Sequence, residues 1–326
     1  MRRLNEIMKV LGIGLTLLTM TSCYQKELCY THPHTKEINV VFDWKHDLAA
    51  RPAAMRLYTF SRDDGMDMLY EFADYHGGKC GMAPGAYDAL CINSDARRNF
   101  FRNIDKRETF EVYTQDITKL EAINESVSKL PRAKGVEKER MVFEPDSAWS
   151  DATQSPFVVI GEESGRNVSQ TLTLYPKPLF CTYTVEIRNA KNLQHIKGLS
   201  ATLSSLAGGI MAATGAPTEE QVTVAFDVHK QQNGTSIYGS FRNFGYNCRL
   251  SNIKNILMVY ALLDDGSRKF VTYDVTDQVR KAPDPRHVHI ILDGFSVTPY
   301  IGNGSGFRPT VSGWERVDIL VSGYAK

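Results

Sequence analysis

Apolar residues recur at every second position in many short segments of this chain, and this alternation limits the folds that it can adopt. A period of two places alternate side chains on one face of a β-strand, as for Ile38, Val40, Phe42 and Trp44 in the segment Glu37–Trp44. Gly, Pro, Asn and Asp bound most of these segments, as expected for turns between strands. Further strands are predicted in the first half at 55–60, 69–72, 86–92, 109–113 and 157–160.

A second series of predicted strands begins near residue 169. These strands are 170–175, 181–187, 199–206, 222–228, 256–262, 270–273, 288–292 and 317–321. Helical spacing of apolar residues occurs in one segment, Ile117–Leu130, which ends before Pro131. Many short strands with few helices indicate an all-β fold built from sandwiches or barrels.

A polar, glycine-containing stretch, Gly161–Asn167, separates the two series and lacks apolar periodicity. We place a domain boundary in this stretch. The sequence then predicts an N-terminal β-sandwich over residues 37–164 and a C-terminal β-sandwich over residues 165–326. Each part is long enough to bury its own hydrophobic core.

The N-terminal segment has the features of a targeting sequence and a tether. Arg2, Arg3 and Lys9 accompany a short apolar run, and Cys23 directly follows small residues. The run is shorter than the roughly 20 apolar residues of a transmembrane helix, and a cysteine in this position is the lipobox pattern of bacterial lipoproteins. We therefore predict a signal peptide over residues 1–22, lipidation of Cys23 and a tether over residues 23–36. The alternative is an ordinary secretory signal followed by a chance cysteine.

Charge and cysteine content exclude some classes of protein. The formal net charge is +1, and the basic excess lies in the predicted signal peptide. No stripe of Lys and Arg favours nucleic-acid binding, which needs cations that neutralise phosphates. Lipidation of Cys23 leaves five of the six cysteines, an odd number, so at least one thiol stays unpaired. A disulfide between Cys80 and Cys91 is one alternative, whereas Cys181 and Cys248 are expected to be buried thiols.

The chain lacks the motifs of zinc hydrolases, P-loop proteins, serine hydrolases and dinucleotide-binding folds. We therefore predict no catalytic residue, no metal and no cofactor. His287 and His289 face the same side of a predicted strand, but no third metal ligand can be placed. The acidic segment Asp63–Asp67 lacks the order of an EF-hand and is interpreted as a turn. The glycine-rich Gly302–Gly306 is interpreted as a loop.

Three further features allow both a functional and a structural interpretation. The segment Asp274–Val279 carries two carboxylates but no evident cleft, so a strand end followed by a capped helical turn is favoured. Trp149 and Trp314 could stack on sugars, although large apolar rings lie more often in a core. The segment Asp146–Ala148 matches a short acceptor pattern for O-glycosylation.

Several motifs, taken in order, resemble those of fimbrillin-like lipoproteins of Bacteroidales. They are Pro84–Ile92, Leu203–Gly209, Phe241–Gly245, Asp274–Val279 and Trp314–Val321. Together they make most of the chain after Cys23 similar to fimbrial anchor and minor-subunit lipoproteins, a family that includes related domains of unassigned function. The resemblance implies two tandem transthyretin-like β-sandwiches after a lipidated tether, at the outer membrane and on the cell surface.

The resemblance also implies a mode of assembly, in which an exposed sheet edge accepts a strand from the next subunit. Polymerising members of the family lose their first strand by cleavage after a basic residue, whereas anchor-type members keep it. Lys45 and Arg51 follow the first strand here. We expect this strand to be retained, because cleavage would detach most of the protein from its lipid.

With the first strand retained, the accepting groove is expected in the C-terminal sandwich. The candidate groove residues are Ile256, Met258 and Tyr260, or Val317, Ile319 and Val321. The predicted function is therefore that of a non-enzymatic, fimbria-like anchor or accessory subunit with fimbrillin-like partner subunits, joined to the membrane through Cys23. A surface glycan-binding lipoprotein is the alternative.

Overall fold

A computed structural model describes residues 35–63, 65–161, 169–247, 253–297 and 313–318 of the chain. The fold is nearly all β, which confirms the predicted fold class. The described residues from Lys36 onward form one compact unit. Each strand that was predicted before residue 293 overlaps a strand of the structure.

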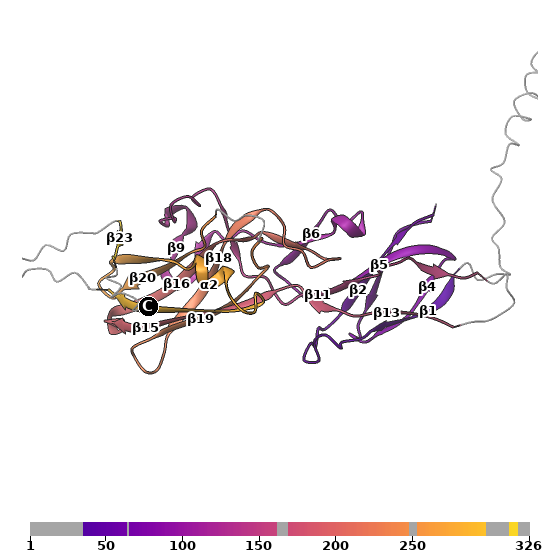
Figure 1. The fold of residues 1–326 in the computed structure, drawn as a ribbon, viewed down its shortest axis with the longest axis horizontal. Helices are drawn as coiled ribbons and strands as arrows, with labels where there is room; N and C mark the ends of the chain where they lie inside the picture. Colours follow the sequence, from indigo (N-terminus) through magenta and orange to yellow (C-terminus); the bar gives the residue numbers. More distant parts are fainter. Residues whose placement is uncertain (1–34, 64, 162–168, 248–252, 298–312, 319–326) are drawn as a thin grey trace, which may run out of the picture. The chain divides into compact units, whose positions relative to one another are not determined.

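Two facing sheets, here named the N-terminal sandwich, enclose the first hydrophobic core (Figure 1). One sheet has the order β13–β1–β4, and the facing sheet has the order β14–β11–β5–β2–β3 with β12 also paired to β5. The bounds of the first sheet are β1 (Lys36–Phe42), β4 (Gly77–Met82) and β13 (Gln170–Leu174). Those of the second are β2 (Met55–Ser61), β3 (Met68–Phe72), β5 (Gly85–Asn93), β11 (Trp149–Ala152), β12 (Phe157–Val159) and β14 (Lys177–Pro178).

The alternation in β1 produces the face that the sequence predicts. Ile38, Val40 and Phe42 are at most 1% exposed, and they share a core with Met55 and Leu57 of the facing sheet. The Phe42 ring meets the Phe72 ring edge-on, with ring centroids 5.5 Å apart. β1 is therefore a core strand with partners on both of its edges.

A sheet of nine strands, here named the C-terminal sandwich, encloses the largest core. The order is β22–β15–β19–β18–β16–β20–β21–β23, and β10 pairs with β18 off this path. β18 connects the two parts of this sheet, since its first part pairs with β16 and its end pairs with β19. The bounds are β10 (Arg140–Phe143), β15 (Cys181–Lys191), β16 (Ile196–Ala207), β18 (Gln221–Lys230), β19 (Ile237–Asn243), β20 (Ile256–Leu263), β21 (Arg268–Asp274), β22 (His287–Ser296) and β23 (Trp314–Arg316).

A small third sheet has the order β17–β7–β6. Its strands are β6 (Asn99–Arg102), β7 (Glu111–Thr114) and β17 (Gly209–Met211). Phe110 and Val112 from this region share a core with Leu90 of β5 and with Phe244, which follows β19. The remaining short helices are η1 (Arg107–Thr109), η5 (Leu193–His195) and α2 (Thr276–Arg280).

The predicted helix over Ile117–Leu130 is wrong. The segment instead forms β8 (Lys119–Leu120), η2 (Glu121–Ile123), β9 (Glu125–Ser126) and η3 (Val127–Lys129). Asn124 adopts a left-handed conformation with φ of 49°, which interrupts a helix. The apolar residues that suggested a helical face pack as a covering layer on β20. Their spacing therefore reflects tertiary contacts of an irregular segment.

Strand pairing crosses the predicted boundary between residues 164 and 165. β13 lies after that boundary but pairs in parallel with β1, and β10 lies before it but pairs in parallel with β18. Most of the stretch Gly161–Asn167 lies outside the described residues. The two-domain division stays a prediction. Strand pairing does not divide the chain at one position, because each sandwich contains a strand from the other side of the predicted boundary.

Candidate functional site

The face of β20 that was expected to line a groove is buried. Ile256, Met258 and Tyr260 are 8%, 3% and 0% exposed. The segment 117–136 covers them, and the Tyr260 hydroxyl donates a 2.9 Å hydrogen bond to the Pro131 carbonyl. The interpretation of these three residues as an accessible groove is therefore wrong, because the segment 117–136 of the same chain packs over them.

Of the second predicted set, Val317 lies in the described part of the chain, at the edge of the same sandwich. Val317 packs partly against the large core, and its N–H donates to the Phe270 carbonyl over 2.9 Å. Ile319 and Val321 lie outside the described residues. In place of the predicted strand 317–321, the described strand is β23, which ends one residue before Val317.

The geometry of β21 leaves part of its backbone facing outward. β21 pairs with β20 along its whole length, whereas β23 pairs only with Arg268–Phe270. Because the Phe270 carbonyl points to Val317, the backbone groups of Thr272 and Asp274 also point away from β20. Within the described ranges, no strand pairs with this second half of β21 on its outer side.

The opposite edge of the sandwich, formed by β22, is closed by side chains. The Gln278 amide donates to the Ile291 carbonyl over 3.0 Å and accepts from the Ile291 N–H over 2.8 Å. The Tyr273 hydroxyl donates to the Gly294 carbonyl over 2.9 Å. Covering an edge in this way prevents another strand from pairing there.

The segment Asp274–Val279 forms a strand end followed by the short helix α2, which confirms its structural interpretation. One Asp274 oxygen accepts hydrogen bonds from the Thr276 hydroxyl and N–H, and the other lies 2.8 Å from Lys254 Nζ. Burial acts to raise the pKa of Asp274, but these hydrogen bonds and the Lys254 ammonium outweigh it, so this pKa is lowered. The carboxylate therefore fixes the turn between the two edges.

The first strand is held on both sides. β1 pairs over five residues with β13 and over six with β4, and it is the only described strand paired with either. Lys45 and Arg51 lie exposed in the loop that follows. Lys45 Nζ stands 3.3 Å from the Tyr175 ring centroid, and the Arg51 guanidinium donates to two backbone carbonyls of its own loop.

The two predicted histidines face outward on β22 and bond to separate groups. His287 Nδ1 lies 2.8 Å from Asp284, and His289 Nδ1 lies 2.6 Å from the Thr184 hydroxyl. In the described part of the chain, no three His, Cys, Asp or Glu side chains gather in a way that could hold a metal ion. In the segment Asp63–Asp67, both end carboxylates accept backbone N–H groups, as in a turn.

The two tryptophans considered for sugar stacking pack against other rings. Trp149 meets Phe180 edge-on at 5.8 Å between centroids, and its indole N–H donates to Asp47 over 2.8 Å. Trp314 meets Tyr260 edge-on at 5.3 Å. Neither arrangement leaves a ring standing free on a flat surface.

Cys80, Cys91 and Cys181 are free thiols in this structure, so the alternative of a Cys80–Cys91 disulfide is not realised. Burial raises the pKa of the Cys80 thiol to about 11 and has the same effect on the Cys181 thiol. Both thiols are therefore neutral at physiological pH. Cys248 lies outside the described residues.

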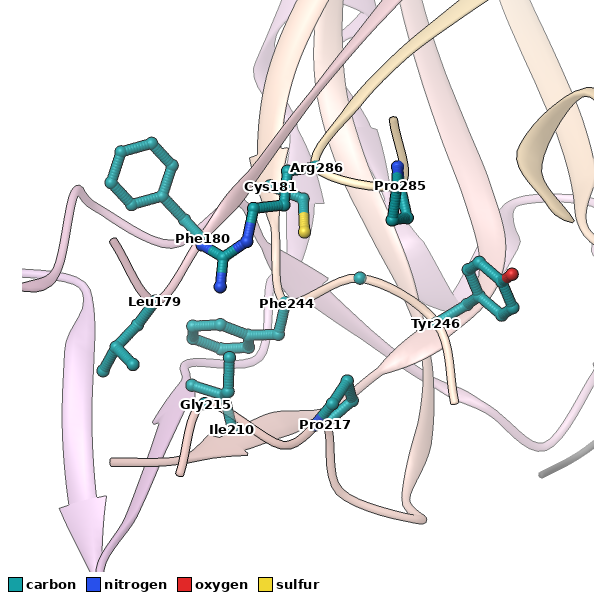
Figure 2. A pocket seen from close by; sticks show the side chains of 11 residues that line it. Leu179, Phe180, Cys181, Ile210, Gly215, Pro217, Phe244, Tyr246, Pro285 and Arg286 are labelled. Carbon is teal, nitrogen blue, oxygen red and sulfur yellow. The ribbon is translucent and has the colours of Figure 1, made fainter. Parts of the chain in front are cut away.

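A small pocket of about 160 Å³ opens where β15 begins, and Figure 2 shows its lining. Cys181, Phe244 and Tyr246 contribute to the wall, and the Arg286 guanidinium reaches over it. One arm of that guanidinium is used structurally, because Nη1 donates to the Pro178 carbonyl over 2.6 Å. The cavity is too small for a typical organic ligand, which needs roughly 300 Å³ or more.

Several predicted features cannot be placed. Cys23 and Gly302–Gly306 lie outside the described residues. Asp146 accepts the N–H groups of Arg97 and Arg98, so its carboxylate already has a structural role beside Ser147. Among the described residues, no helix is long and apolar enough to cross a membrane.

The sandwich fold, with one covered and one partly uncovered edge, defines an all-β architecture. Comparison with known proteins assigns the chain to a family. The family model "Domain of unknown function (DUF5119)" matches residues 22–227. The chain belongs to this family. No curated protein matches the sequence.

Two solved structures are similar to the chain, and one of them is similar enough to show a shared fold. A candidate adhesin from Bacteroides ovatus has a TM-score of 0.60 at 18% identity, over 86% of this chain and 99% of that one. The fimbrial anchor protein Mfa2 from Porphyromonas gingivalis has a TM-score of 0.47 at 12% identity, over 79% of this chain and 90% of that one. Only the first score is high enough to support an argument, and at this identity it concerns the fold alone. The predicted resemblance to the fimbrillin-like family is confirmed at that level.

Sequence reasoning missed two features of this site. The cover over β20 had a signal, since β20 is a nearly continuous apolar run, as is typical of a strand buried on both faces. The role of Gln278 had no signal in the sequence. A glutamine that closes a sheet edge cannot be distinguished, by sequence alone, from any other polar residue of a short helix.

Proposed function

We propose that this protein is a lipoprotein of the outer membrane, displayed on the cell surface and held by lipid on Cys23, that acts as an anchor or accessory subunit of a fimbria-like structure. Its role is non-enzymatic, and the outer edge of β21 accepts a strand from a fimbrillin-like partner subunit. The observation that carries this proposal is the contrast between two edges. Gln278 and Tyr273 close β22, whereas the backbone groups of Thr272 and Asp274 face outward.

The N-terminal sandwich supports the same assignment. Its own first strand fills the position between β13 and β4, with apolar side chains that are almost fully buried. The position between β13 and β4 is therefore open to a partner strand only if β1 leaves. The C-terminal edge is therefore the better acceptor in a chain that keeps its first strand.

An added strand beside β21 would gain both hydrogen bonds and apolar contacts. Val271 and Tyr273 already belong to the large core, so alternate side chains of an incoming strand would extend that core. Each large apolar side chain that becomes fully buried contributes about 1.5–3 kcal/mol. A few such residues are enough for a stable contact between subunits.

Replacing Thr272 by proline tests the acceptor edge. Thr272→Pro removes an outward N–H without removing a hydrogen bond to β20, since edge positions tolerate proline. Crosslinking and pull-down from intact cells should recover fimbrillin-like proteins with the wild-type chain and with the control Thr272→Ala. Recovery should fall strongly for Thr272→Pro. Equal recovery with a folded Thr272→Pro chain would argue against strand addition at this edge.

Membrane anchoring has a separate test. Cys23→Ala should move the protein from the membrane pellet to the soluble fraction, because the proposed lipid is its anchor. Cys181→Ala is the matched control, since Cys181 lies in the folded unit. A Cys23→Ala chain that still sediments with membranes after a carbonate wash would contradict the lipoprotein assignment.

The alternative function, glycan binding, has one described surface in its favour. Phe100 of β6 is 38% exposed, its ring lies 5.9 Å from that of Tyr113, and the Arg102 guanidinium stands 4.9 Å from the Tyr113 centroid. Aromatic faces beside polar groups can stack on sugar rings. Recovery of polysaccharide by the wild-type chain, lost in Phe100→Ala, would favour this alternative.

A further inference from the structure

Exposed apolar side chains gather at one end of the N-terminal sandwich. Met66, Met68, Val158 and Ile160 are 76%, 43%, 55% and 54% exposed, and they make up half of the strongly exposed large apolar side chains in the described residues. We name this group the apolar tip. Large apolar side chains that cluster on a surface mark a contact with a partner or a membrane.

Strand pairing and hydrogen bonds bring the tip residues together. Val158 of β12 pairs with Ala86 of β5. The loop that carries Met66 lies against the same residue, because Asp63 Oδ2 accepts the Ala86 N–H over 3.0 Å and the Arg62 N–H donates to the Ala86 carbonyl over 2.9 Å. Met68 then begins β3 directly after this loop.

Hydrogen bonds and strand pairing place the tip near the start of β1. The Gln170 side chain accepts the Ile160 N–H over 2.9 Å and donates to the Val158 carbonyl over 2.8 Å. Gln170 in turn pairs with Ile38, near the start of β1. The chain therefore enters the folded unit beside the tip.

Covalent geometry keeps this end close to the proposed lipid. Only 12 residues, 24–35, lie between the lipid-bearing position Cys23 and the start of β1. A chain of that length spans at most about 45 Å, even when fully extended. If Cys23 is lipidated, as the proposed function states, the tip is the part of the sandwich with the shortest path to the bilayer.

Three charged groups near the tip have partners. Arg62 pairs with Asp88 at 2.8 Å, Lys79 pairs with Glu37 at 2.7 Å, and Asp67 accepts the Ser61 N–H at 2.8 Å. Partnered charges cost less to bring toward a low-dielectric surface than isolated ones. These three charged groups are therefore held by local partners, while the side chains of Met66 and Val158 stand exposed beside them.

We propose that the apolar tip contacts the phospholipid surface to which the chain is tethered. Met66, Val158 and Ile160 enter the interfacial region of the bilayer and orient the N-terminal sandwich on it. This inference rests on the proposed lipidation for its geometry. It adds a second point of attachment, made by side chains, that the lipid alone does not provide.

Fluorescence quenching in the lipidated full-length chain tests this contact. The lipidated chain is reconstituted in vesicles of phosphatidylethanolamine and phosphatidylglycerol that contain brominated acyl chains. Ile160→Trp should gain a quenched, blue-shifted emission component relative to wild type. The control Leu48→Trp, at a residue 77% exposed in the loop after the far end of β1, should gain none. Equal quenching of the two variants, or quenching of neither, would overturn the proposal.

A second experiment does not depend on the lipid. The full chain with Cys23→Ala is sedimented with the same vesicles, with and without the pair Val158→Glu and Ile160→Glu. The pair should lower the bound fraction by roughly tenfold or more, because two apolar side chains no longer enter the interface, while Leu48→Glu should leave it unchanged. No vesicle binding before the substitutions, or equal binding after them, would count against the tip. Failed lipidation would show separately, as wild-type protein in the soluble cell fraction.

Discussion

β1 and β21 are strands of equal length in the two sandwiches, but they differ in what surrounds them. β1 lies between two partners over nearly all of its length, whereas β21 has one full partner and one that covers only three residues. With β1 in place the position between β13 and β4 is filled, whereas the second half of β21 has no described strand on its outer side. The comparison supports the proposal that a partner strand is added to the C-terminal sandwich while β1 is retained.

The largest expected effect comes from weakening β1. Phe42→Ala removes a side chain that is 1% exposed and packed against Phe72, so the free energy of unfolding should fall by about 3–5 kcal/mol in urea titration. Phe100→Ala, at an exposed ring, should change it by less than about 1 kcal/mol. If both substitutions had the same small effect, β1 would not be the core strand that this comparison requires.

A smaller effect is expected from opening the closed edge. Gln278→Ala leaves the Ile291 N–H and carbonyl without their partners, which should lower the free energy of unfolding by about 1–3 kcal/mol. The substitution also leaves backbone groups of β22 open to another strand, as on the outer side of β21. Analytical ultracentrifugation should therefore detect self-association. Gln278→Glu keeps the acceptor for the Ile291 N–H and should be intermediate. A fully stable, monomeric Gln278→Ala chain would show that the edge is closed by something else.

The smallest effect concerns the turn that joins the two edges. Asp274 has a lowered pKa, so its charge stabilises the fold above its ordinary pKa of 3.8, and this contribution is lost as the pH falls through the lower folded value. Asp274→Asn should therefore destabilise the protein by about 0.2–1 kcal/mol at neutral pH, as for a solvent-exposed pair. The difference from wild type should shrink only below pH 3.8. A difference that persists unchanged in strong acid would exclude an electrostatic cause.

The sequence was sufficient for the fold class, because a period of two is visible in each strand that has one buried face. Ile38, Val40 and Phe42 are an example, and their predicted face is the buried one. The helix prediction failed because the apolar residues of 117–130 are spaced by contacts with β20 rather than by a helical turn. Local patterns cannot distinguish these two origins of the same spacing.

The candidate site was predicted less well than the fold. The C-terminal location follows from retention of β1, but the choice of Ile256, Met258 and Tyr260 assumed that one face of β20 is open. Whether a face is open depends on a segment about 130 residues earlier in the chain, which strand periodicity does not encode. The closing of β22 likewise depends on one side-chain amide, Gln278, that only the folded backbone brings to Ile291.

The most direct test of the central claim is photo-crosslinking in intact cells from the two edges. A photoreactive residue is placed at Thr272 on β21 and, in a second strain, at His289 on β22, both on outward edges of the same sandwich. The account predicts a crosslink from position 272 to a peptide of a separate fimbrillin-like protein, and none from position 289. A crosslink from position 272 only to the chain itself, or equal crosslinks from both positions, would contradict it.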